Sequence, residues 1–104
     1  MMGDEFEWDD AKAARNKRDH KVSFETARAV FDDPNAIWFL DEYHGTDEER
    51  FLTVGMSGSG LLFVVHTQRN DRIRIISARS ADYHEERRYN DGHRARFRRR
   101  PGND

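Results

Sequence analysis

The sequence of 104 residues contains no cysteine and only two prolines. Without cysteine there are no disulfides, no thiolate zinc sites and no cysteine nucleophiles. The apolar run from Leu61 to Val65, which no other apolar run exceeds in length, is far too short to span a bilayer. The N-terminal segment has neither a basic region nor a hydrophobic stretch, so it lacks the form of a secretory signal. We therefore expect a soluble cytoplasmic protein.

Charge is distributed unevenly along the chain, although the formal net charge is only −2. The first 50 residues carry 14 acidic and 7 basic residues, whereas the other 54 carry 6 acidic residues and 11 basic ones, all arginine. Arginine presents a planar fork of donors that matches phosphate. We expect the second half to bind a phosphate-bearing partner; alternatively, its arginines pair with the acidic first half or face solvent.

The length suits one compact domain, in which aromatic residues supply much of a small core. Capping residues, proline and glycine mark helix starts and ends, and their positions predict three helices. The first begins at Asp9 or Asp10 and runs to about His20, and the second is capped by Ser23 and ends before Pro34. The third runs from near Asp82 to about Asn90, before Gly92.

Extended segments are predicted at residues 36–40, 50–56, 61–67 and 72–79, with a further short edge strand possible at 5–9. Their hairpin-length connections favour an antiparallel meander. The fold class is therefore α+β, with two N-terminal helices, an antiparallel sheet of three to four strands and a C-terminal helix. The helices should cover one face of the sheet. Residues 1–92 form this single domain, and 93–104 form an arginine-rich tail expected to be mobile unless bound.

A series of motifs makes the chain recognisable. They comprise Phe6-Glu7-Trp8-Asp9 with Lys12 and Asn16, His20 before Val22-Ser23-Phe24-Glu25, Val64-Val65-His66-Thr67 with Arg69, the segment Ile73 to Arg79, and Glu85 with Tyr89. In this order, over about residues 6–90, the chain resembles the BrnT toxins of type II toxin–antitoxin systems. The sequence departs from the family pattern at Asp19-His20-Lys21, where Lys-His-Gly is usual, and at Tyr83-His84, where arginines are usual.

The resemblance implies a RelE-like fold and a ribonuclease that needs no metal or other cofactor. It also implies a BrnA-like antitoxin with a ribbon-helix-helix domain, so that operator DNA is contacted only through the antitoxin. RNA is the implied substrate, and no membrane partner is expected.

Metal-free RNA cleavage uses the 2′-hydroxyl as nucleophile, and so requires a base, an acid and cations directed at the phosphoryl oxygens. Side chains of these types within the motifs supply the candidates. The candidate catalytic residues are His66, Arg74, Arg79, Glu85, His20 and Tyr89, and the candidate substrate-binding residues are Lys12, Asn16 and Arg69.

Each candidate also has an ordinary structural explanation. Lys12, Asn16 and His20 recur every four residues, so they line one helical face that either contacts RNA or is simply solvated. His66 lies at the end of an apolar strand, where it is either an acid or base or a histidine hydrogen-bonded within the sheet. Arg69, at the following turn, either holds phosphate or faces solvent.

The other candidates also have both a functional and a structural explanation. In a regular strand, side-chain alternation puts Arg79 on the face of Ile73 and Ile75, and Arg74 on the opposite face. Only a bulge or the strand end could bring both arginines to one site, and salt bridges to the acidic half are the alternative. Glu85 is either a base or a capping partner of Asp82. Tyr89 either acts on RNA or packs in the core with its hydroxyl wet.

The main hypothesis is a ribonuclease toxin in which guanidinium groups converge in one cleft beside a proton-transferring side chain. Two alternatives are open. One is an inactive, toxin-like co-repressor bound to a DNA-binding antitoxin, and the other is a general RNA-binding module that leaves RNA intact.

Overall fold

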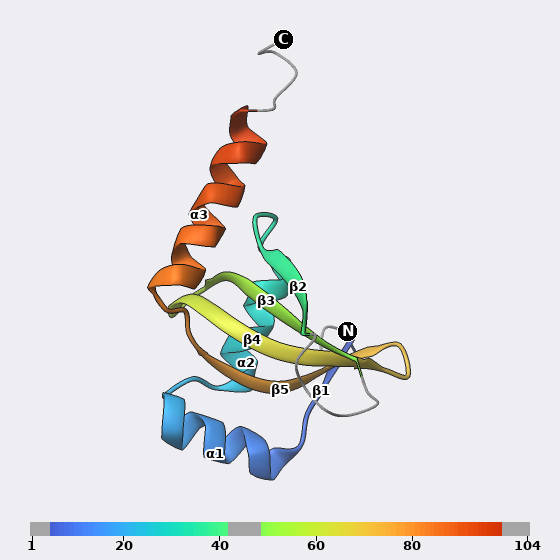
Figure 1. The fold of residues 1–104 in the computed structure, drawn as a ribbon. Helices are drawn as coiled ribbons and strands as arrows, with labels where there is room; N and C mark the ends of the chain where they lie inside the picture. Colours follow the sequence, from blue (N-terminus) through green and yellow to red (C-terminus); the bar gives the residue numbers. More distant parts are fainter. Residues whose placement is uncertain (1–4, 42–48, 99–104) are drawn as a thin grey trace.

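The computed structural model describes residues 5–41 and 49–98, with side chains described as far as Gly92. Its elements surround one sheet (Figure 1). In chain order they are β1 (Phe6–Glu7), α1 (Asp10–His20), α2 (Phe24–Ala27), the 3₁₀ helix η2 (Arg28–Asp32), β2 (Ile37–Asp41), β3 (Arg50–Ser57), β4 (Gly60–Arg69), β5 (Arg72–Ser80) and α3 (Tyr83–Arg98).

Both N-terminal helices begin at the expected caps. The Asp9 side chain accepts a hydrogen bond from the Lys12 amide, and the Ser23 side chain accepts one from the Thr26 amide. Each bond satisfies a backbone donor that has no partner within the helix. α1 ends at His20, because the next residue, Lys21, has a φ of 64° that stops helical propagation. None of the described helices is both long and apolar enough to cross a membrane.

The sheet has five strands in the order β1-β5-β4-β3-β2. Strands β2 to β5 form the predicted antiparallel meander. The prediction of three to four antiparallel strands is wrong because β1 joins the sheet in parallel with β5, pairing Phe6 with Ile73. Two residues carry too short a pattern to predict this pairing, which depends on a partner far along the chain.

The core lies between one face of the sheet and α2 with η2, and α1 flanks the edge of β5. Phe24, Val30 and Val64 are fully buried in this core. Packing there is close: a Cβ on Gly55 of β3 would lie 2.7 Å from Val30 Cγ1. Glycine therefore allows η2 to approach the strand.

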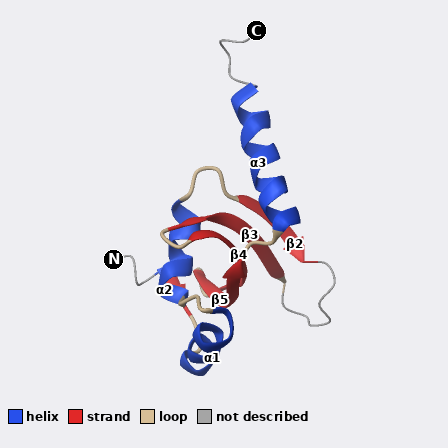
Figure 2. Ribbon diagram, turned by 90° about the vertical axis from the view of Figure 1, so that its left-hand side faces the viewer, coloured by secondary structure: helices blue, strands red, loops and turns tan. Residues whose placement is uncertain are grey.

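α3 lies on the other side of the sheet from α2 (Figure 2), so the prediction that the helices share one face is wrong. It also continues through Gly92 to Arg98, past its predicted end. A Cβ on Gly92 would lie 3.3 Å from Ile37 Cγ2, so this glycine permits close approach to β2 rather than ending the helix. Residues 99–104 of the predicted tail lie outside the described residues.

Candidate active site

A β-bulge in β5 decides which side chains share a face. Val65 pairs with Ser77, but the next β4 residue, His66, pairs with Ile75, which leaves Ile76 as the extra residue. A bulge of this kind shifts the alternation of side chains beyond it. Arg79 and Arg74 consequently lie on the same, open face of the sheet. The regular alternation predicted for these arginines is wrong, and the exception allowed for a bulge applies.

The two arginines nevertheless do not converge. Their partners on β4, Phe63 and Thr67, are four residues apart, which corresponds to roughly 13 Å along the strand. Arg74 Nη1 pairs with Glu7 Oε2 at 3.0 Å, because the parallel β1 brings Glu7 alongside. The expected single cleft of guanidinium groups is therefore not formed, and each arginine has its own carboxylate partner.

The stronger of these two pairs joins Arg79 to Glu85. Nη1 donates to Oε1 at 2.9 Å and Nη2 to Oε2 at 2.7 Å, a bidentate geometry. The hydrogen bond to Glu85 raises the pKa of Arg79, so its guanidinium is always charged. The Arg79 Cζ also lies 4.1 Å from the centroid of the Phe63 ring.

Glu85 is held from a second direction by the start of α3. Its Oε1 accepts from the Asp82 amide, and the Asp82 side chain accepts from the Glu85 amide, each at 2.8 Å. This reciprocal capping box is the structural alternative predicted for Glu85. It forms together with the Arg79 pair, so the carboxylate is fixed in place while its side chain keeps 17% exposure.

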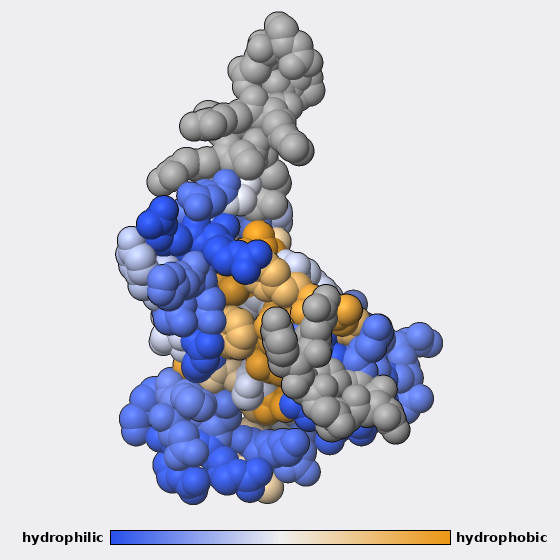
Figure 3. Space-filling view, viewed as in Figure 1, coloured by the Kyte–Doolittle hydropathy of each residue, from blue (hydrophilic) through white to orange (hydrophobic). Residues whose placement is uncertain are grey.

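An open groove of about 350 Å³ runs beside this pair, between α3 and the sheet. Phe39, Leu52 and Phe63 contribute its apolar surface, and His84 and Glu85 line the α3 side. Figure 3 shows apolar side chains gathered between the hydrophilic surfaces of α3 and α1. The groove thus combines aromatic rings with the fixed Glu85 carboxylate and with Arg88, and Arg79 lies over the Phe63 ring beside it.

His66 has a different environment, because it is only 1% exposed. Its Nε2 lies 2.6 Å from the Thr53 hydroxyl, and rings of Phe31, Trp38 and Phe51 surround it with centroids 4.7–5.9 Å away. Burial lowers the pKa of His66 to about 4. The imidazole is therefore neutral near pH 7 and enclosed in the covered face, without contact to the groove.

Two further candidates are also turned inwards. Asn16 is 7% exposed and bonds the edge of β5: its side chain donates to the carbonyls of Ala78 and Val22 and accepts from the Ala78 amide. Tyr89 is 8% exposed and donates to Asp33 Oδ2 at 2.6 Å. Asn16 thus links α1 to β5, and Tyr89 links α3 to the end of η2.

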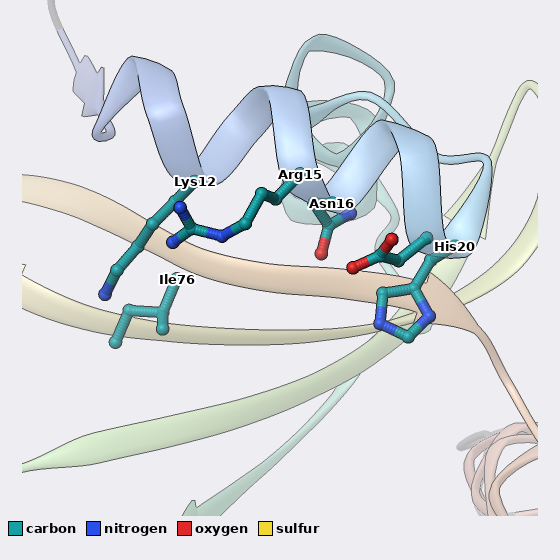
Figure 4. A pocket seen from close by; sticks show the side chains of 6 residues that line it. Lys12, Arg15, Asn16, His20 and Ile76 are labelled. Carbon is teal, nitrogen blue, oxygen red and sulfur yellow. The ribbon is translucent and has the colours of Figure 1, made fainter.

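Lys12 and His20 both line a hollow of about 240 Å³ between α1 and the edge of β5. In Figure 4, Lys12 and Arg15 extend from α1 towards Ile76, and His20 lies at the C-terminal end of the helix. Asp19 completes the lining together with Asn16. Arg69 belongs to neither the groove nor the hollow, since it is exposed at the β4–β5 hairpin opposite Arg72.

A comparison with protein families now adds a second line of argument. Residues 8–85 match the family described as ribonuclease toxin, BrnT, of type II toxin–antitoxin system. The chain belongs to the BrnT family. The matched region includes the Arg79–Glu85 pair and the α1 hollow, and it ends within the first turn of α3. A comparison with individual curated proteins finds no match.

Membership of the BrnT family places the chain among type II toxins named for ribonuclease activity and implies an antitoxin partner. Within residues 5–41 and 49–92, whose side chains the structure describes, no three histidine, aspartate or glutamate side chains are grouped to hold a metal ion. The metal-free mechanism remains a prediction.

Two residues at these positions were not among the candidates from the sequence. Arg15 follows Lys12 by three residues, a spacing that puts both on one helical face. His84 precedes Glu85 and lines the same groove. The helical spacing could have identified Arg15, whereas His84 depends on how α3 meets the sheet.

Proposed function

We propose that this BrnT-family chain is the toxin of a type II system and a metal-independent endoribonuclease that inhibits translation. The observation that carries the proposal is the Arg79–Glu85 pair beside an open groove in a chain of this family. A RelE-like fold belongs to the same proposal. So does a BrnA-like ribbon-helix-helix antitoxin, through which alone operator DNA would be contacted.

The proposed reaction begins with RNA lying along the groove. The 2′-hydroxyl oxygen attacks the adjacent phosphorus while the Glu85 carboxylate accepts its proton. Arg79 stabilises the negative charge that develops on the phosphoryl oxygens. The bond from phosphorus to the 5′-oxygen breaks, and that oxygen takes a proton from His84, which lines the same groove. The products are a 2′,3′-cyclic phosphate and a 5′-hydroxyl.

The aromatic surface of the groove suits single-stranded RNA. Unpaired bases stack on aromatic rings and on guanidinium planes. Phe63 lies beneath Arg79, and Phe39 lies beneath Arg88 with a Cζ-to-centroid distance of 4.1 Å. Each ring–guanidinium pair offers a flat, cationic surface for a base. His66 has no part in this scheme because it is enclosed on the covered face.

The test is a cleavage assay of the purified full chain on single-stranded RNA in the presence of EDTA. Arg79→Ala should lower the cleavage rate about 100-fold or more, because it removes a cation from the transition state. Glu85→Gln retains an acceptor for the Asp82 amide but cannot take up a proton, so a similar loss is expected. Arg72→Ala, at the exposed opposite end of β5, is the matched control and should cleave normally.

Sequencing of the RNA ends checks the chemistry, since 2′-hydroxyl attack leaves a 2′,3′-cyclic phosphate. Cleavage no faster than that of Arg79→Ala would overturn the proposal in favour of a co-repressor without activity. Salt-sensitive retention of intact RNA would instead favour an RNA-binding module.

A further inference from the structure

The hollow beside α1 is lined mainly by basic and polar side chains. α1 contains four lysine and arginine residues and two aspartates, although the first half of the chain is strongly acidic. Lys12, Arg15 and His20 face the hollow. The one carboxylate in its lining, Asp19, is paired with Arg18 at 3.2 Å.

Two well-defined features of the fold, the β5 bulge and the Asn16 side chain, form the bottom of the hollow. The bulge leaves Ile76 outside the regular ladder, and Ile76 forms the β5 side of the lining. Asn16 closes the space behind it by bonding to Ala78 through both its side-chain nitrogen and its side-chain oxygen. These two residues hold α1 at a set distance from β5, so Lys12 and Arg15 project over a defined gap (Figure 4).

The lining indicates which part of a ligand would fit. No phenylalanine, tyrosine or tryptophan lines the hollow, and five of its six lining residues are charged or polar. Its volume of about 240 Å³ is below the roughly 300–1,000 Å³ of pockets that enclose drug-sized ligands. Among the described residues, no carboxylate is paired with the side chain of Lys12 or Arg15. Lysine and arginine without such partners are suited to phosphate.

We propose that this hollow is a phosphate-binding subsite for the backbone of single-stranded RNA, with Lys12 and Arg15 as its main ligands. The inference rests on the proposed function and extends it, because it adds an RNA contact beyond the groove. Ile76 is three residues from Arg79 on the same strand, roughly 10 Å away. An RNA strand that passes Arg79 and crosses the edge of β5 therefore reaches α1. Its contribution to affinity is independent of base identity.

The experiment measures binding of a fluorescently labelled, 2′-O-methylated RNA oligonucleotide by anisotropy over a range of salt concentrations. The 2′-O-methyl groups block cleavage, so binding is measured separately from activity. The test variant is Lys12→Ala/Arg15→Ala. The matched control is Lys17→Ala/Arg72→Ala, which likewise removes one lysine and one arginine, at exposed residues that do not line the hollow and leave the Arg18–Asp19 pair intact.

Each cation that contacts single-stranded RNA contributes about 0.7 to the slope of log affinity against log salt. The test variant should therefore lose about 1.4 from this slope and, at 0.1 M salt, on the order of tenfold or more in affinity. The loss should be equal for oligo(U) and oligo(A). The control should keep the wild-type slope, and both variants should unfold at the wild-type midpoint.

Equal binding by the test and control variants would overturn the subsite, as would a loss that depends on the base. Neither result would affect the cleavage proposal, which depends on Arg79 and Glu85. Conversely, if Arg79→Ala cleaves RNA normally while the test variant loses affinity, the cleavage assignment fails and the subsite stands.

Discussion

Polar motif residues in the interior of the molecule differ in environment from those at its open rim, by which we mean Arg79 and Glu85 beside the groove. Asn16, His66 and Tyr89 are each at most 8% exposed, and each bonds to another part of the fold. Arg79 and Glu85 remain partly exposed beside a groove. Motif residues therefore belong to two classes. Buried residues of the first class stabilise the fold, and the solvent-exposed residues of the second class are those to which we assign the proposed reaction.

This division has a simple physical cause. A buried polar group must find a hydrogen-bond partner within the protein, because losing water without replacement costs free energy. Once Asn16 or His66 has such a partner, binding RNA would require breaking that contact. Arg79 pays much less for exchanging its partner, because water already reaches it.

Replacing Asn16 tests the interior class with the largest expected effect. Asn16→Ala leaves the Ala78 amide and carbonyl and the Val22 carbonyl without their partner. We expect the free energy of unfolding in urea to fall by about 2–4 kcal/mol. Arg18→Ala, on the exposed side of the same helix, should change it by less than about 0.5 kcal/mol. If Asn16→Ala is as stable as Arg18→Ala but binds RNA poorly, Asn16 contacts RNA and does not act mainly in stability.

Because His66 is buried, the free energy of unfolding should depend on pH. The pKa of His66 is about 4 in the folded protein and near 6.5 in an unfolded chain. Between these values only the unfolded state binds the proton, so the free energy of unfolding decreases as pH falls. From pH 7.5 to pH 5 the expected decrease is about 2 kcal/mol.

Urea titrations at the two pH values measure this decrease. His66→Gln keeps a group that can hydrogen-bond to Thr53 but does not titrate, so most of the decrease should vanish. His20→Gln removes an exposed histidine and should retain it. If both variants behave like the wild type, His66 is not the buried titrating group.

Tyr89→Phe is expected to have the smallest effect. It removes the hydroxyl that donates to Asp33 Oδ2, while the Met56 amide continues to donate to the same oxygen. The free energy of unfolding should fall by on the order of 1 kcal/mol, and the rate of RNA cleavage should not change. A large loss of cleavage with unchanged stability would place Tyr89 in the reaction.

Much of the local structure could be predicted from the sequence. Asp9 and Ser23 cap their helices as expected, and the four longer strands lie where the apolar segments predict. These features depend on neighbours a few residues away. The parallel pairing of β1 and the passage of α3 through Gly92 depend instead on Ile73 and Ile37, which lie far along the chain.

The candidate site shows the same limit. The sequence contains Arg74, Arg79 and Glu85, and it predicts that they can serve phosphate chemistry. It predicts neither the bulge at Ile76, which puts both arginines on one face, nor the distance that keeps them apart. It likewise does not distinguish His66 from His20, since one histidine becomes enclosed by rings only when β2, β3 and η2 come together.

By itself, the sequence determined the α+β class, the helix starts, the meander and the membership of the BrnT family, because these are written in local patterns and motifs. The tertiary structure decided which motif residues are buried, which carboxylate each arginine binds, and where cations line a hollow. Those outcomes arise from contacts between distant segments, whose packing determines how much water each side chain keeps.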